Sequence, residues 1–192
     1  MTPAFRHLLI TDRNACADLV ATVAAALRRV PAAVLLHERD LPARAQIELV
    51  HALRALRPAA LLVSGRCDVA LATDAAGVHL HGLGIGPTDA RGLLGPKRLI
   101  GVSCHSQAEV RAALQAGADY ATFGPVFDTP SKRAFGPPLG LQALADAARL
   151  GLPLFALGGV DPSNAGACRA AGAHGIAAIR AFLDETSQPW PE

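Results

Sequence analysis

The 192-residue sequence is poor in aromatic side chains, which make up 4% of it, and its formal net charge at pH 7 is only +2. Acidic and basic residues are interspersed along the chain and form no basic stretch. Proteins that bind nucleic acid usually carry a basic face, and those that bind single strands add aromatic side chains on which bases stack. The composition therefore predicts that nucleic acid is not a partner.

Long apolar runs and paired cysteines are also missing. No apolar run reaches the roughly 18 residues of a membrane-spanning helix, and residues 1–13 lack an apolar core of signal-peptide length. The cysteines are widely spaced, which is typical of buried thiols in a reducing compartment. These absences predict a cytoplasmic protein that does not enter a membrane. The four cysteines are Cys16, Cys67, Cys104 and Cys168.

Short apolar runs dominate what is present. Apolar residues make up 51% of the chain and charged residues 18%, which indicates one folded domain of this length. The runs alternate with stretches of helical spacing such as residues 18–29 and 42–58. Ser106, with Glu109 three residues later, has the pattern of a helix-opening capping box. The eight runs are residues 8–13, 33–36, 60–63, 77–80, 98–102, 119–123, 153–157 and 175–179.

The runs are continuously apolar, as expected of parallel strands that are covered on both faces. A doubly wound open sheet usually has five or six strands, so eight repeats in fewer than 200 residues favour a closed α/β barrel of the (β/α)8 TIM type. We predict a single barrel domain over residues 1–184, followed by a C-terminal tail over residues 185–192.

Residues that follow the strands should carry the chemistry, because TIM barrels act at the C-terminal ends of their strands. Residues 124–132 (GPVFDTPSK) bring Thr129, Ser131 and Lys132 together, and Gly158-Gly159 follows the seventh strand. With the start of the last helix near residues 178–181, they predict a phosphate site. The alternative is that the glycines only make a tight turn and that the lysine is an ordinary solvated one.

Three histidines, His37, His81 and His105, each follow a strand and could transfer protons at a common mouth. Glu38 is a candidate general base, or else an ion-pair partner of Arg39 or Lys132. His79 is expected to point into the barrel wall. No cluster of His, Asp and Glu at the mouth has metal-ligand spacing, so no metal site is predicted.

Five segments resemble the thiamine phosphate synthase family, whose superfamily also contains a thiazole tautomerase. The likeness extends from about residue 8 to residue 182. It implies a barrel that binds a thiazole phosphate; the synthase joins that phosphate to a pyrimidine methyl diphosphate with Mg²⁺ and releases pyrophosphate. The segments are residues 77–80 (GVHL), 100–106 (IGVSCHS), 117–120 (GADY), 124–132 (GPVFDTPSK) and 156–160 (ALGGV).

The resemblance also implies roles for individual residues. The loop of Thr129, Ser131 and Lys132 would contact pyrophosphate and thiazole, and Ser103 would lie near the pyrimidine. Substrate contacts are also expected from Arg39 and Ser64, which stand where the family has lysine and asparagine. The thiazole phosphate would be held by the backbone of Gly158, Gly159, Ile179 and Arg180.

Two departures concern the metal. Gly65 and Gly84 stand where the synthase has the carboxylates that hold Mg²⁺. A diphosphate leaving group carries concentrated negative charge, which Mg²⁺ usually neutralises. We therefore favour tautomerase-like proton transfer on a thiazole phosphate, with no cofactor. The tautomerase's own histidine is matched by Pro125, so His37, His81 or His105 would move the proton.

Two alternatives remain. One is a divergent thiamine phosphate synthase, which would need Mg²⁺, and the other is a non-catalytic module that binds phosphate. Each would take a small phosphorylated partner. The sequence leaves open whether two copies form a homodimer.

Overall fold

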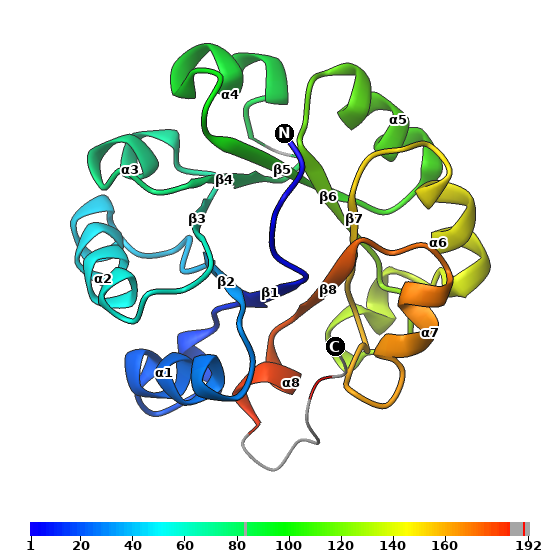
Figure 1. The fold of residues 1–192 in the computed structure, drawn as a ribbon, viewed down its shortest axis with the longest axis horizontal. Coiled ribbons are helices and arrows are strands. Elements are labelled where there is room, and N and C mark those ends of the chain that lie inside the picture. Colours follow the sequence, from blue (N-terminus) through cyan, green and yellow to red (C-terminus); the bar gives the residue numbers. More distant parts are fainter. Residues whose placement is uncertain (83, 185–189, 191–192) are drawn as a thin grey trace.

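Eight parallel strands form a closed barrel with helices around its outside (Figure 1). The structure is a computed structural model that describes residues 1–82, 84–184 and 190. Neighbouring strands pair in chain order, and β8 pairs with β1 to close the ring. The predicted (β/α)8 barrel is confirmed. Of the predicted tail, residues 185–189, 191 and 192 lie outside the described part, and Trp190 stacks on Phe182 with ring centroids 4.4 Å apart.

Every apolar run predicted as a strand overlaps one strand of the structure. The strands are β1 His7–Ile10, β2 Ala33–Leu36, β3 Leu61–Ser64, β4 Gly77–Leu80, β5 Leu99–Cys104, β6 Tyr120–Phe123, β7 Leu154–Ala156 and β8 Gly175–Ala178. The α-helices are α1 Leu19–Arg29, α2 Ala43–Ala55, α3 Cys67–Ala72, α4 Pro87–Leu94, α5 Gln107–Gln115, α6 Gly140–Ala148, α7 Ala165–Ala170 and α8 Arg180–Leu183, and two 3-10 helices are η1 Arg13–Ala15 and η2 Pro130–Phe135. Two strand ends differ from the prediction by more than one residue: β1 ends at Ile10, three residues before the predicted end, and β5 continues two residues further and includes Ser103 and Cys104.

Local signals set several helix ends. The Asp18 side chain accepts a hydrogen bond from Ala21 N at 3.0 Å and caps α1. Ser106 Oγ accepts from Glu109 N at 3.2 Å and caps α5, as predicted. The return bond of the capping box differs, because the Glu109 carboxylate accepts from the backbone N of His105 and not of Ser106.

The strand side chains alternate between two buried layers. Leu8 and Leu35 belong to a cluster inside the barrel, made mainly of strand residues. Leu9 and Leu36 pack instead with helix residues such as Val23, between the barrel and its helices. Both faces of each strand are therefore buried, which is why apolar residues predominate in the strands on both faces.

The cysteines are unpaired and lie mostly in the buried layers. All four cysteines are free, and Cys67, Cys104 and Cys168 are buried. Burial raises the pKa of Cys104 to about 12, so its thiol stays protonated. Within the described residues, no helix has the length and apolar character needed to cross a membrane.

His79 is a buried polar group inside the barrel, as predicted. Its Nδ1 lies 3.1 Å from Tyr120 Oη, and its Nε2 lies 3.0 Å from Ser103 Oγ and 3.3 Å from Thr122 Oγ1. Gly101 makes room for the tyrosine, because a Cβ there would lie 2.1 Å from Tyr120 Cζ. Burial lowers the pKa of His79 to about 3, so the ring is neutral at pH 7.

This burial predicts a dependence of stability on pH. The unfolded chain protonates His79 near its ordinary pKa of 6.5, and the folded chain only near 3. The stability that neutral His79 supports is therefore complete above pH 6.5 and is lost as the pH falls toward 3, by about 1.4 kcal/mol per pH unit. Urea unfolding between pH 4.5 and 7 should show a shallower pH slope for His79→Gln than for the unchanged protein. Equal slopes would contradict the lowered pKa of His79. The matched control is His51→Gln, on the exposed side of α2.

Candidate active site

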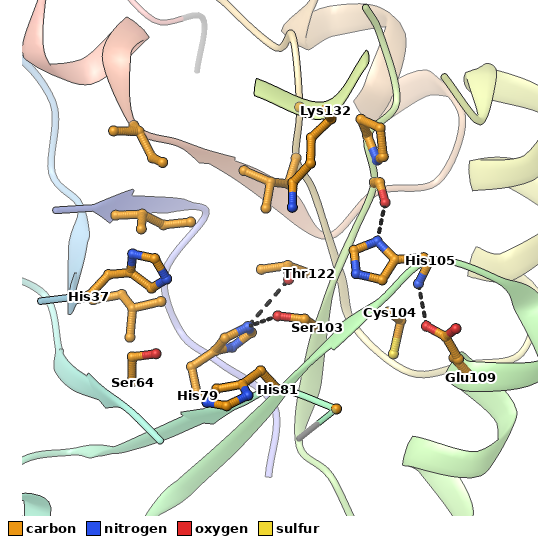
Figure 2. A pocket seen from close by; sticks show the side chains of 18 of the residues that line it. His37, Ser64, His79, His81, Ser103, Cys104, His105, Glu109, Thr122 and Lys132 are labelled. Atoms are coloured by element: carbon orange, nitrogen blue, oxygen red, sulfur yellow. Dashed lines mark hydrogen bonds between the residues drawn. The ribbon is translucent and has the colours of Figure 1, made fainter. Parts of the chain in front are cut away.

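A cavity of about 470 Å³ opens at the C-terminal ends of the strands (Figure 2). We call it the first cavity. Its polar lining comes from strand ends around the ring, where a TIM barrel places its chemistry. The predicted residues that line it are His37, Arg39, Ser64, His81, Ser103, His105, Lys132, Gly158 and Ile179.

Side-chain alternation along the chain after β2 decides which residues face this cavity. Leu35, His37 and Arg39 line it, whereas Leu36 packs toward the helices and Glu38 is buried beside Arg13. This two-residue period is that of an extended strand continued past its last paired residue. The side chain of His37 therefore points into the cavity, and that of Glu38 points away from it.

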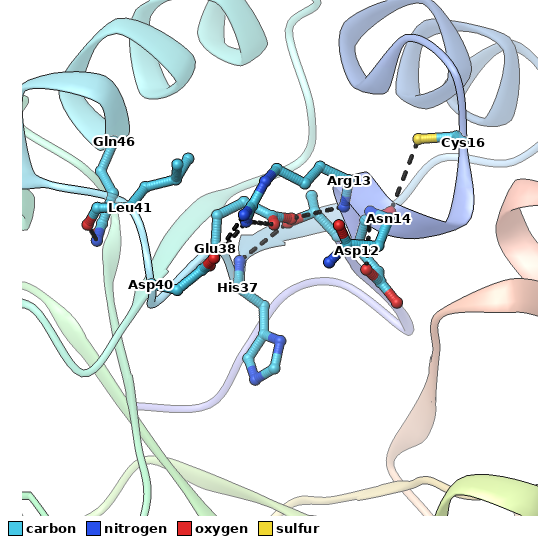
Figure 3. A network of polar contacts seen from close by, with 10 residues as sticks. Asp12, Arg13, Asn14, Cys16, His37, Glu38, Asp40, Leu41 and Gln46 are labelled. Carbon is cyan, nitrogen blue, oxygen red and sulfur yellow. Dashed lines mark hydrogen bonds and ion pairs between the residues drawn. The ribbon is translucent and has the colours of Figure 1, made fainter.

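Glu38 belongs to a separate polar network at the edge of the barrel (Figure 3). Its Oε1 accepts hydrogen bonds from Thr11 Oγ1 at 2.7 Å and from the Arg13 backbone N at 3.2 Å. Its Oε2 pairs with the Arg13 guanidinium at 3.1 Å. Thr11 Oγ1 also accepts from His37 N at 2.9 Å, so the network fixes the backbone that carries His37. The ion-pair partner of Glu38 that the structure shows is Arg13, which the sequence analysis did not name.

The histidines at the mouth differ in how they are held. His105 Nδ1 lies 2.5 Å from the carbonyl oxygen of Gly124, so Nδ1 carries the proton and donates it. The pKa values of His37 and His81 are lowered, first by burial and then by the charge of Arg39. Arg39 is thus close enough to influence both rings.

A second cavity of about 440 Å³ adjoins the first. Four residues line both cavities: Lys132, Leu157, Gly158 and Ile179. The side chain of Lys132 extends from η2 toward the first cavity (Figure 2). The predicted phosphate residues Thr129, Gly159 and Arg180 line only the second cavity.

The two glycines of the second cavity are required by their surroundings. Gly158 and Gly159 have φ of 91° and 64°, in the left-handed region. A Cβ on Gly158 would lie 2.6 Å from Pro125 Cα, and one on Gly159 would lie 2.5 Å from the Asp128 carbonyl oxygen. Within the described part of the chain, the backbone N–H groups of Gly158, Gly159 and Arg180 donate no hydrogen bond. An anion in the second cavity would supply the acceptors that these groups lack.

The structure thus brings most of the predicted residues to one mouth, and two need comment. Glu38 lies apart, and the side chain of Ser131 is outside the described part of the chain. Three further lining residues were not predicted to lie at the site: Thr122, Asp128 and Asp161. The position of Thr122 on a predicted strand was a usable signal, whereas the aspartates were hidden in loops whose path the sequence does not reveal.

The donor set does not fit Mg²⁺, which prefers carboxylate oxygens. Gly65 and Gly84 bring no side chain, and Glu38 is engaged by Arg13. The carboxylates of Asp128 and Asp161 accept from Arg133 and Ser163 in their own loops. Among the described residues, no group of three or more His, Cys, Asp or Glu could hold a metal ion.

The family model and the curated relatives of highest identity belong to one family. The family model described as thiamine monophosphate synthase matches residues 7–182. A putative thiamine-phosphate synthase of Geobacter sulfurreducens is 47% identical over 93% of this chain and 87% of its own length. A thiamine-phosphate synthase of Roseiflexus is 41% identical over 91% of this chain and 77% of its own. The solved thiamine phosphate pyrophosphorylase from Pyrococcus furiosus superposes with a TM-score of 0.84 at 32% identity, covering 94% of this chain and 88% of that one.

The Glu38 network predicts a stability effect that is separate from substrate binding. Arg13→Gln would leave the buried Glu38 carboxylate without its ion pair, which should lower the free energy of unfolding by more than the loss of an exposed ion pair does. Urea unfolding of Arg13→Gln, Glu38→Gln and the double variant measures this. The double variant should lose less than the sum, since it buries no charge.

The matched control is Arg44→Gln, whose exposed pair with Glu48 on α2 should change stability by less than about 0.5 kcal/mol. An Arg13→Gln variant as stable as Arg44→Gln would show that the network does not depend on this ion pair.

Proposed function

The chain belongs to the thiamine monophosphate synthase family, and on that premise we propose that it is a transferase that joins a thiazole phosphate to a pyrimidine methyl diphosphate. The printed names of its relatives favour this alternative over the tautomerase-like reaction predicted from the sequence. Thiamine phosphate and pyrophosphate are the expected products.

The observation that carries the proposal is the pair of adjoining cavities. Their volumes, about 470 and 440 Å³, each suit a small ring compound, and Lys132 lines both. A synthase must hold two substrates side by side, one of which ends in a monophosphate and the other in a diphosphate. A tautomerase handles one substrate and would leave the second space without a role.

The thiazole phosphate is assigned to the place where the two cavities adjoin, which is lined by the residues common to both. Its phosphate fits the second cavity, where the N–H groups of Gly158, Gly159 and Arg180 lack acceptors. Its ring would then extend past Leu157 and Ile179 into the first cavity.

The pyrimidine diphosphate is assigned to the first cavity. Its carbon–oxygen bond to the diphosphate breaks, and the ring nitrogen of the thiazole forms the new bond to that carbon with its own electron pair. The leaving pyrophosphate gains negative charge, which the ammonium of Lys132 is positioned to stabilise. Ser103, held by His79 at 3.0 Å, supplies a hydroxyl beside the reacting carbon.

Lys132→Gln tests the assignment. Loss of the positive charge where the two cavities adjoin should lower kcat/KM by about a hundredfold or more, because the charge acts on the leaving group in the transition state. The measurement is formation of thiamine phosphate from both substrates, followed by chromatography. Lys97→Gln is the matched control, since Lys97 is exposed just before β5, at the other end of the barrel, and its loss changes the net charge equally.

Three results would contradict the proposal. Equal activity of Lys132→Gln and Lys97→Gln would remove Lys132 from the reaction. Binding of both substrates without product under any condition would favour the non-catalytic module. Exchange of thiazole hydrogens with deuterated solvent, without thiamine phosphate, would restore the tautomerase-like hypothesis.

A further inference from the structure

The imidazole of His81 lies between the two glycines that stand at the family's carboxylate positions. A Cβ on Gly65 would lie 3.2 Å from His81 Nε2, and one on Gly84 would lie 3.9 Å from His81 Cε1. Gly65 also has φ of 69°, which L side chains rarely adopt. The ring thus crowds a side chain at Gly65, whereas one at Gly84 would meet it in ordinary van der Waals contact.

The first cavity is rich in positive and hydrogen-bond-donating groups. Besides Lys132 and Arg39 it is lined by several histidines, among them His37 and His81. Its only carboxylate among the described lining residues is Glu109, which accepts from His105 N at 2.6 Å. A cavity with this lining attracts a polyanion without the help of a bound cation.

The side chains have the chemistry that diphosphate binding needs. Arginine is always charged, and its planar group donates paired hydrogen bonds to phosphate oxygens. An imidazole donates a hydrogen bond in either protonation state. His37 and His81 enter the first cavity from β2 and β4 (Figure 2), and the charge of Arg39 acts on both rings. All three side chains line the first cavity, so each faces the space in which an anionic group would lie.

We propose that Arg39 and His81, together with His37, bind the diphosphate of the substrate in the place of a carboxylate-bound divalent cation, so that the protein needs no Mg²⁺. This inference rests on the proposed synthase function for the identity of the diphosphate. It departs from the metal requirement that the family resemblance implies.

The first test is turnover without divalent ions. The protein, freed of metal by dialysis against EDTA, is given both substrates with excess EDTA or with Mg²⁺. We expect thiamine phosphate to form at rates that agree within about twofold, because the lining already neutralises the leaving group. Loss of more than tenfold of the activity in EDTA, restored by Mg²⁺, would overturn the inference while leaving the proposed function intact.

The second test needs no turnover, so it separates the two proposals. Calorimetric titration with inorganic pyrophosphate in EDTA should show binding. Replacing the EDTA with Mg²⁺ should change the Kd little. His81→Gln and Arg39→Gln should each weaken that binding at least tenfold. Their matched controls are His51→Gln and Arg44→Gln, exposed on α2, which should bind as the unchanged protein does.

Each outcome of this titration is decisive. Binding only with Mg²⁺, or no binding in either condition, would overturn the inference. So would unchanged affinity in both His81→Gln and Arg39→Gln, provided that their thermal melting shows them folded. Pyrophosphate binding with the expected losses, but no thiamine phosphate from the two substrates, would instead support the anion site and contradict the synthase function.

Discussion

The alternation of side chains along parallel strands, closed into a ring, determines the rest of this structure. Inward side chains pack around the barrel axis and outward side chains pack against the helices, so neighbouring residues in the sequence have different surroundings. His37 enters the cavity, while Glu38 turns to Arg13 and holds the chain in place. The chemistry at the mouth is therefore assembled from alternate residues of separate strands.

The sequence predicted the barrel well because its signal is local and repeated. Continuous apolar runs such as residues 33–36 mark strands buried on both sides, and Ser106 marks a helix start. That the Glu38 side chain points away from the cavity could have been inferred from the two-residue alternation that begins at Leu35. Its partner could not, since Arg13 lies 25 residues away and only the closed ring brings the two together. The position of the His81 ring beside Gly65 likewise depends on the path of two strand ends.

The two cavities differ in the groups that can bind an anion: charged side chains in the first and backbone N–H groups in the second. The first cavity is lined by Arg39, Lys132 and imidazoles, whereas the second is lined by Gly158 and Gly159, whose backbone N–H groups donate to no acceptor among the described residues. Carboxylates at the second cavity, such as Asp128, accept from donors in their own loops, which reduces their repulsion of a phosphate. In the proposed reaction, the monoester and the diphosphate would thus meet different surroundings in the two adjoining cavities.

The central claim is that the two cavities hold two anionic ligands at once. Calorimetric titration of thiazole phosphate into protein already saturated with inorganic pyrophosphate tests it most directly. Simultaneous occupancy predicts a full equivalent of thiazole phosphate bound, with pyrophosphate retained on the protein. Competition, in which saturating pyrophosphate abolishes thiazole phosphate binding and each ligand displaces the other, would contradict the account.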